Sequence, residues 1–406
     1  MPGFSFSARI PLVGTPDYGA ALDRIVEASP TSLVELLLEV VEPLGAWDLG
    51  VYLVDFQGLV LQPLSLSGQP TEPIVAEEEV AGSMAGRAFQ SGEPVTAVRD
   101  DGIRVWVPLV ERGERTGVLA VTLAQVDESL MAECVRLGRF AGLLVRAFAR
   151  MSDLMHLQRR RRSMTLAASM QWDLLPPLTV RCSHALACGR LEPAYEIAGD
   201  AFDYSIDERY LHSAIFDAMG HGVESTLMTT LAVGAYRHAR RDGSPPAAAH
   251  RATDEAVTAH CMEEAFVTGS IIRLELETGI LEWTNAGHPQ PLLLRGHQVI
   301  GPLACAASLP FGLGGECRSV ASEALEPGDS VLFFTDGITE GRSHAGEAFG
   351  TDRLADLWSL HTGSGLLPDE ILRRLVEAVT GFNAGKLRDD ASLLQISWFG
   401  PTGSHG

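Results

Sequence analysis

The sequence predicts an α+β protein in which two folded parts are joined by a helical segment. Strand-like and helical patterns alternate over residues 1–127, and residues 128–177 are helical in pattern until two prolines end them. Over residues 178–398, strand patterns come in runs with helices between them, as in layered α+β domains. The remaining tail, 399–406, is rich in small residues and is expected to fray.

Composition narrows the class of protein. A chain of 406 residues with 46% hydrophobic and 20% charged residues is typical of a soluble globular protein with two domains and a linker. The formal net charge of −21 argues against nucleic acid as a partner, because binding to a phosphate backbone depends on clusters of Lys and Arg.

Cysteine placement and the N-terminus predict a cytoplasmic location. The six cysteines are scattered without a C-x-x-C pair, which fits neither a disulfide framework nor a zinc site but fits free thiols in a reducing compartment. The first residues lack the basic and apolar regions of a signal peptide. No stretch approaches the ~18 apolar residues of a membrane span, so no membrane contact is expected.

Local patterns in the N-terminal part favour a mixed sheet-and-helix domain. A helical pattern over 18–42 is interrupted near Pro30, and a shorter one lies within 81–92. Alternating or apolar runs predict strands over 51–56, 59–66, 103–110 and 117–123. The last two strands flank a charged turn that contains glycine, and this is typical of a hairpin.

Apolar residues in the middle segment follow the alternating three- and four-residue spacing of a coiled-coil seam. They are Leu137, Phe140, Leu144, Ala147, Met151 and Leu154. The seam stops at Gln158 and Arg161, and an apolar pattern resumes in another register before Pro176. Two interpretations stay open: a dimerising connector that could transmit a twist, and an amphipathic helix that packs on its own domain.

Strand patterns dominate the C-terminal part. They cover 210–216, 271–277, 280–285, 330–335 and 392–398. Helical patterns lie between them, at 222–241, 246–263 and 367–383.

Aspartates recur at the ends of apolar strands, and Asp200 and Asp203 are expected to follow a strand and a glycine. They are Asp200 and Asp203 in EIAGDAFDY, Asp217 in AIFDAMGHG, Asp336 in SVLFFTDGITEG, and Asp389 and Asp390 in KLRDDASLLQISW. A single Asp before Gly is usually a turn residue, but four separate segments could bring carboxylates to one place. Such oxygen ligands suit Mg²⁺ or Mn²⁺. Two ions about 3.5–4 Å apart can activate water for attack on phosphorus, and a helix that begins after Asp217 could direct its amides at a phosphate.

Eight motifs in order give the C-terminal part a family resemblance. They are LLPP at 174–177, AGDAFDY at 198–204, DAMGHG at 217–222, FVTGS at 266–270, NAGHPQPLLL at 285–294, LPFGL at 309–313, TDGITEG at 335–341 and RDDASLL at 388–394. The set resembles the metal-dependent protein phosphatases of the PPM type, in their SpoIIE-like branch. The resemblance implies a β-sandwich flanked by helices that hydrolyses phosphoserine or phosphothreonine on a protein, with two Mn²⁺ or Mg²⁺ ions.

The resemblance also implies residue roles. The expected metal ligands are Asp200, Asp217, the carbonyl of Ala218, Asp336, Asp389 and its neighbour Asp390, since the doublet leaves the assignment open by one residue. Asp217 is expected to bridge both ions, and Asp200 and Asp217 count as catalytic. His221 is a candidate general acid, and the alternative for it is a loop-fixing role.

Other positions have weaker expectations. Asp203 is expected behind the ligands rather than among them, and Asn285 and His288 are expected to be structural. Arg190 could steer phosphate, although a lone Arg in a strand is usually a surface charge. Ala198 departs mildly from the glycine that the family often has.

The N-terminal part resembles a GAF domain over residues 34–55, 81–97 and 105–123. GAF domains commonly bind small molecules, so the resemblance implies either a small-molecule sensor or a dimerisation module. We expect a homodimer in which the GAF domain regulates the phosphatase through the linker. The expected substrate is a phosphorylated anti-anti-sigma factor of the STAS type. The alternative is a GAF-based scaffold that binds a partner without turnover. A cyclic-dinucleotide synthase is disfavoured, because Ala201 follows Asp200 where that signature needs adjacent acids.

Overall fold

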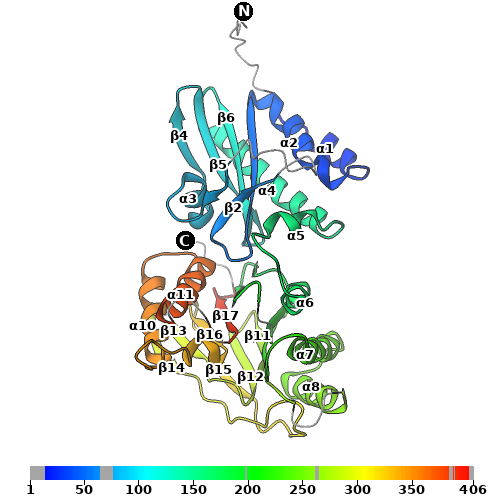
Figure 1. Ribbon diagram of the computed structural model, residues 1–406, viewed down its shortest axis with the longest axis vertical. Coiled ribbons are helices and arrows are strands. Elements are labelled where there is room, and N and C mark those ends of the chain that lie inside the picture. The colour runs from blue at the N-terminus through cyan, green and yellow to red at the C-terminus, as the bar shows by residue number, and fades with distance from the viewer. Residues whose placement is uncertain are drawn as a thin grey trace, which may run out of the picture. The chain divides into compact units, whose positions relative to one another are not determined.

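The computed structural model describes residues 14–64, 76–196, 199–260, 265–383, 387 and 389–401. The chain forms two compact units (Figure 1). The first unit contains Met1–Glu111 and Arg115–Arg161, and the second contains Arg112–Glu114 and Arg162–Gly406. Cys261 and Ala198 fall outside the described residues.

The first unit is built on one six-stranded sheet in the order β3-β2-β1-β6-β5-β4. Its strands are β1 Asp48–Val54, β2 Val60–Pro63, β3 Glu78–Glu79, β4 Val95–Arg99, β5 Gly102–Glu111 and β6 Glu114–Leu123. Helices α1 (Tyr18–Ile25) and α2 (Leu33–Val41), with short 3-10 turns at Pro30–Ser32 and Glu42–Leu44, pack with α4 (Glu128–Ala149) in a core on one face. Helix α3 (Met84–Ser91) packs on the other face. The strands, the break near Pro30 and the α3 helix predicted from the sequence are confirmed.

The middle segment is not the continuous helix that the sequence predicts. It divides into α4, α5 (Leu154–Arg159) and α6 (Leu166–Leu174). Side-chain hydrogen bonds mark the start of each new helix: Ser152 accepts from the Leu154 amide at 3.1 Å, and Thr165, the N-cap of α6, accepts from the Ala168 amide at 3.2 Å.

The predicted seam is used within the first unit. Leu137 and Leu144 are buried in the core against α2 and the sheet, and Phe140 packs against the same core. Met151 is 67% exposed. The structure therefore shows the alternative in which this helix packs on its own domain.

The second unit is a sandwich of two sheets. The five-stranded sheet has the order β15-β12-β11-β10-β9, with β9 Asp200–Ile206, β10 Tyr210–Ala218, β11 Val267–Glu275, β12 Ile280–Ala286 and β15 Ala321–Ala324. The six-stranded sheet has the order β14-β13-β16-β17-β8-β7, with β7 Thr179–Arg181, β8 Ala185–Glu192, β13 Leu292–Arg295, β14 Gln298–Pro302, β16 Ser330–Phe334 and β17 Ala391–Trp398.

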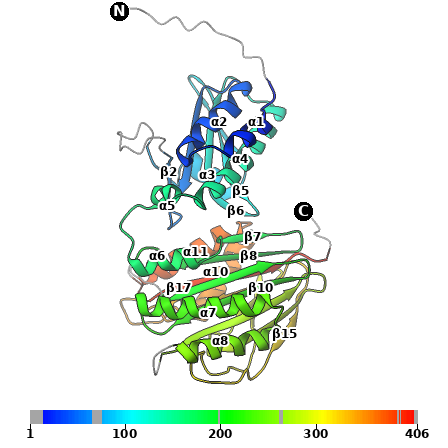
Figure 2. The same cartoon turned by 90° about the vertical axis from the view of Figure 1, so that its right-hand side faces the viewer.

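Helices cover both outer faces of the sandwich. Helices α7 (Val223–Arg241) and α8 (Pro246–His260) pack on the five-stranded sheet. Helices α10 (Thr351–Gly363) and α11 (Pro368–Phe382) pack on the six-stranded sheet. Figure 2 shows α7 and α8 on the viewer's side of these strands, with α10 and α11 behind. The predicted α+β sandwich is confirmed, whereas α10 and the strands β7, β8, β9, β13, β14 and β15 were not predicted.

The core follows strand alternation. Residues of both sheets that face inward, such as Ile215 and Phe333, form a core between the sheets. Their neighbours Phe216 and Phe334 face the outer helices instead. The described helices include none that is long and apolar enough to cross a membrane.

Candidate active site

Two of the predicted aspartates are neighbours across a strand pair. Asp200 begins β9 and Asp217 lies near the end of β10, and the two are direct partners in the antiparallel register. Phe202 and Ile215, two residues away on each strand, lie in the core between the sheets. Because side chains alternate along a strand, both carboxylates face the space between the sheets at one end of it. The expectation that Asp200 follows a strand is wrong, since it starts one.

The other sheet brings further aspartates to the same end. Asp336 is the first residue of the short helix α9 (Asp336–Thr339), directly after β16, and Asp390 directly precedes β17. The Asp200 amide donates to Oδ2 of Asp390 at 3.2 Å, which links the two sheets. Gly337 lets helix α9 approach the backbone of Asp390 closely, because a Cβ there would lie 1.8 Å from the Asp390 carbonyl oxygen.

The pKa values show how closely the carboxylates gather. Burial raises the pKa of Asp217 to about 7, and the charges of Asp336 and Asp389 contribute to the rise. Burial also raises the pKa of Asp390 to about 7 and the pKa of Asp200 well above its ordinary range, with further contributions from neighbouring carboxylates. These five aspartates, Asp200, Asp217, Asp336, Asp389 and Asp390, are called the carboxylate cluster below. Crowded like charges favour protonation unless a cation enters.

The structure adds supporting residues that sequence reasoning missed. Thr335 donates to Oδ2 of Asp200 at 2.8 Å and accepts from the Ser392 amide at 2.9 Å. Gln171, a buried residue of α6, donates to the Asp200 carbonyl at 2.7 Å. Burial raises the pKa of Asp336, and the negative charge of Glu340 adds to the rise. Thr335 and Glu340 belong to the motif TDGITEG, and their place in that motif could have identified them from the sequence. Gln171 lies in no such motif, and a single Gln in a helix gives no indication of a contact with the site.

The other two predicted site residues lie at the end of β10 and in the loop that follows it. Ala218 donates its amide to the Gly199 carbonyl at 3.3 Å. Its own carbonyl oxygen lies 3.2 Å from the position that a Cβ on Gly199 would take. His221 is exposed and lies in the loop, just before the Gly222 cap of α7, rather than on the helix itself.

Residues with weaker expectations lie outside the cluster. Asp203 is buried against α7, where it pairs with Arg237 at 2.7 Å and Arg240 at 2.6 Å. Arg190 is not a surface charge: it is largely buried and pairs with Glu192 at 3.1 Å.

His288 is buried and structural in its contacts. Its ring Nδ1 lies 3.0 Å from the Thr268 hydroxyl, on the strand opposite Asp217. Asn285 fixes its backbone by two hydrogen bonds, at 2.7 and 2.8 Å. Burial lowers the pKa of His288 to about 3, so the ring is neutral.

The donor set fits a hard divalent cation. The cluster offers only carboxylate and carbonyl oxygens, and Oδ1 of Asp390 is buried without a hydrogen-bond partner. Among the described residues, no three His, Cys, Asp or Glu side chains are already arranged so that they could hold a metal ion. Aspartate side chains turn about single bonds, so the convergence of the strand ends decides the fit more than their present angles do.

The C-terminal part of the chain is similar to known proteins. The family model described as Stage II sporulation protein E (SpoIIE) matches residues 207–399. The stage II sporulation protein E of Bacillus subtilis (strain 168) is 24% identical over 205 residues, which are 49% of this chain and 24% of that protein. The phosphoserine phosphatase RsbU of the same organism is 23% identical over 233 residues, which are 57% of this chain and 68% of that protein.

Solved structures include a similar domain. The SiaA-PP2C domain of Pseudomonas aeruginosa aligns with 57% of this chain, and the alignment covers 93% of that domain. The TM-score is 0.48 and the sequence identity is 22%. The chain spans only about a quarter of the sporulation protein that it matches. The family match lies wholly within the second unit. Within the second unit, residues 207–399 thus match the SpoIIE family model, and the relatives of this part of the chain include a phosphoserine phosphatase.

Proposed function

We propose that the second unit hydrolyses phosphoserine or phosphothreonine monoesters on a protein partner, with two divalent cations in the carboxylate cluster. The observation that carries this proposal is the convergence of five aspartates from both sheets with no arginine or lysine paired to them among the described residues. The RsbU relative is a phosphoserine phosphatase, and this supports the substrate class.

The residues of the cluster have distinct positions for holding the ions. Asp217 is the register partner of Asp200 on its own sheet, and the charges of Asp336 and Asp389 act on it, so it would be the carboxylate shared by the ions. Asp200, Asp336, Asp389 and Asp390 would be the other acidic ligands, and the Ala218 carbonyl would be a neutral one. When bound, the two ions would lower the pKa of a water molecule and offset negative charge on the phosphoryl oxygens.

Other groups of the chain would serve the reaction without touching the ions. Thr335 holds the Asp200 carboxylate in place by its hydrogen bond. The exposed His221 lies on the loop that leaves the site, where it could give a proton to the departing seryl oxygen. The first amides of the long helix α7 follow this loop and are available to a phosphate.

Hydrolysis of p-nitrophenyl phosphate and of a phosphoserine peptide tests the proposal. We expect the full-length protein to turn over both substrates with Mn²⁺ or Mg²⁺ and neither with EDTA. Asp217→Ala and Asp336→Ala should remove this activity. Binding of metal by calorimetry without any turnover would instead favour the alternative, a scaffold that binds a partner.

We further propose that the first unit is a GAF-like regulatory domain of a homodimer and that the substrate is an anti-anti-sigma factor in the cytoplasm. One antiparallel sheet with helices on both faces supports a GAF-like fold. Helix α6 gives a route for regulation, because Gln171 on it contacts the backbone of Asp200. If α6 adjusts the site, Gln171→Ala should change the Mn²⁺ concentration needed for half-maximal rate. An unchanged Mn²⁺ requirement would contradict this route.

A further inference from the structure

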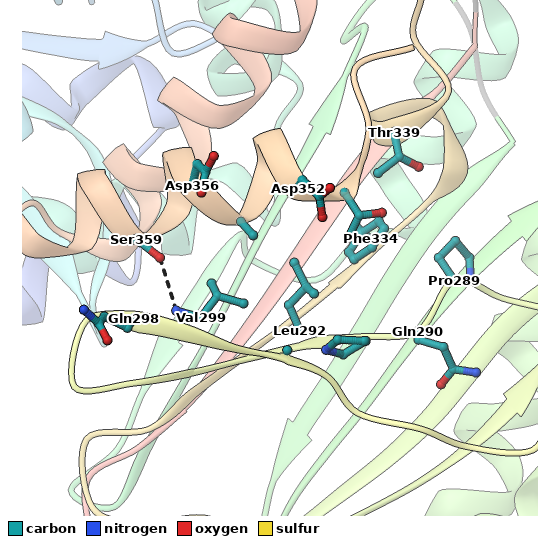
Figure 3. Close-up of a pocket in the computed structure, with 14 residues that line it drawn as sticks. Pro289, Gln290, Leu292, Gln298, Val299, Phe334, Thr339, Asp352, Asp356 and Ser359 are labelled. Atoms are coloured by element: carbon teal, nitrogen blue, oxygen red, sulfur yellow. Dashed lines mark hydrogen bonds between the residues drawn. The ribbon is translucent and has the colours of Figure 1, made fainter.

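A hollow of about 920 Å³ lies on the outer face of the second unit, away from the core between the sheets. It runs between helix α10 and the β13–β14 hairpin, and its lining includes the end of β16 and the last residue of α9. Figure 3 shows Asp352, Asp356 and Ser359 on the helix, with Leu292 and Val299 on the hairpin beneath. This hollow is called the α10 groove below. Its volume falls in the range of sites that take a drug-sized ligand or a few side chains.

The floor and one end of the α10 groove are apolar and fixed. Leu292 and Phe334 are each only 2% exposed and form the floor with neighbouring prolines. At one end the Val299 amide donates to the Ser359 hydroxyl at 3.2 Å, which joins hairpin and helix (Figure 3). The wall residue Gln290 is held by two hydrogen bonds to the backbone of Cys305, each at 2.9 Å. A ligand would therefore meet a preformed surface.

The charge along the α10 groove is negative and uncompensated. Asp352 and Asp356 are exposed, stand four residues apart on one face of α10, and form no ion pair with any residue that the structure describes. Like charges at this spacing destabilise a helix slightly. The nearby Arg353 does not neutralise them, because its guanidinium lies over the rings of Phe349 and Phe382. No described residue of the lining is basic.

The α10 groove is also adjacent to the carboxylate cluster. Thr339 lines the groove and Asp336 belongs to the cluster, and the two are the last and first residues of the single-turn helix α9. Residues three apart on a helix are neighbours, at about 5–6 Å. Phe334, in the groove floor, precedes Asp336 by two residues. A protein whose phosphoserine occupies the cluster would therefore have neighbouring residues within reach of the groove.

We propose that the α10 groove is a docking site for an extended segment of the protein substrate in which arginine or lysine alternates with apolar residues. This inference rests on the proposed phosphatase function and names a recognition element of its substrate. Apolar side chains of the segment would fill the floor over Leu292 and Phe334, and its cations would pair with Asp352 and Asp356.

Binding without catalysis tests the groove separately from the enzyme activity. A fluorescent, unphosphorylated Arg-Leu-Arg-Leu peptide is titrated with full-length protein in EDTA and followed by anisotropy. We expect the double variant Asp352→Asn, Asp356→Asn to weaken binding about threefold to tenfold, as for two partly exposed ion pairs. The matched control Glu255→Gln removes an exposed charge from α8, on the opposite outer layer, and should leave binding unchanged.

Charge exchange keeps the test independent of folding defects. Asp356→Lys should weaken binding of the Arg-Leu peptide and strengthen binding of a Glu-Leu peptide of equal length. A misfolded protein cannot give this reversal of preference. With phosphoserine peptides, the same variants should raise KM and leave p-nitrophenyl phosphate hydrolysis unaltered. Equal peptide affinity in wild type and both variants would overturn the docking site. If free arginine displaced the fluorescent peptide as completely as unlabelled peptide does, the groove would be a site for a small cation, and a peptide partner would be ruled out. If the wild-type protein did not hydrolyse p-nitrophenyl phosphate at all, the proposed phosphatase activity would be contradicted, but the docking site would not.

Discussion

Buried carboxylates occur in two different settings in the second unit. On its outer layers, Asp203, Asp329 and Glu370 are almost fully buried, and each is paired with arginine at 2.6–2.8 Å. At the end of the sandwich, Asp200 and Asp390 are just as buried but lie beside other carboxylates.

The pKa values express the same contrast. Burial by itself raises the pKa of Glu370, but hydrogen bonds from Arg373 and Arg374 outweigh it and hold that pKa below its ordinary value. Burial raises the pKa of Asp217 to about 7, and neighbouring acids add to the effect. Where an acid only stabilises the fold, the chain supplies the cation. Among the described residues none supplies a cation to the cluster, and this contrast supports the proposal that the cluster takes its cations from solution.

The largest expected effect separates activity from stability at the cluster. Asp217→Asn should reduce the metal-dependent rate by about a thousandfold or more, since metal sites of this kind provide several kcal/mol of transition-state stabilisation. In EDTA at pH 8 the same variant should be more stable than wild type by about 1–3 kcal/mol, because an ionised Asp217 with a raised pKa destabilises the metal-free fold above that pKa. Urea unfolding and initial rates measure the two quantities, and lower stability of the variant would contradict the comparison.

The outer layer should respond in the opposite way. Asp203→Asn leaves Arg237 and Arg240 without their partner and should lower the free energy of unfolding by about 3 kcal/mol. The rate per folded molecule should fall far less than in Asp217→Asn. Chemical denaturation combined with rates corrected for the folded fraction checks this. If Asp217→Asn were less stable than wild type and Asp203→Asn were as stable as wild type, the structural and the cation-binding roles of the two aspartates would have to be exchanged.

Added Mn²⁺ should stabilise the folded protein by binding to the carboxylate cluster and to no other site. At a Mn²⁺ concentration a hundred times its dissociation constant, one bound ion adds about 2.7 kcal/mol to the free energy of unfolding. Differential scanning fluorimetry should therefore show a rise in the Tm of wild type and of Asp203→Asn, reversed by EDTA. Asp336→Asn is the matched variant in which the rise should shrink, and an equal rise in all three proteins would place the ions elsewhere.

The smallest effect concerns the orientation of one ligand. Thr335→Val removes the hydroxyl that donates to Asp200 and accepts from Ser392. The loss of this hydrogen bond, worth about 1–1.5 kcal/mol, should cost about tenfold in rate. Thr335→Ser, which keeps the hydroxyl, should restore most of the rate. A rate equal to wild type in the valine variant would mean that Asp200 is fixed by its backbone contacts alone.

Much of this architecture could be predicted from local patterns. Alternating residues such as Ile272 and Leu274 predicted β11 correctly, and glycine-bounded or capped segments predicted α3, α7 and α11. Edge strands such as β14 escaped prediction because they are short and half exposed, so their sequence shows little alternation.

The candidate site shows where sequence patterns lose information. Asp200, Asp217 and Asp336 could be named from ordered motifs, but their convergence depends on the pairing of β9 with β10 and on the approach of β16 and β17. Gln171 reaches Asp200 from 29 positions away, and no local pattern encodes that contact. The continuous linker helix was predicted wrongly because its heptad spacing also suits a helix that packs on its own sheet.

Titration of the metal-free protein with Mn²⁺ by isothermal calorimetry tests the central claim most directly, in wild type, Asp217→Asn and Asp203→Asn. The account predicts about two ions for each wild-type chain, the same number for Asp203→Asn, and loss of this binding in Asp217→Asn. Wild-type binding in Asp217→Asn, or no binding in any of the three proteins, would contradict a carboxylate cluster that exists to hold divalent cations.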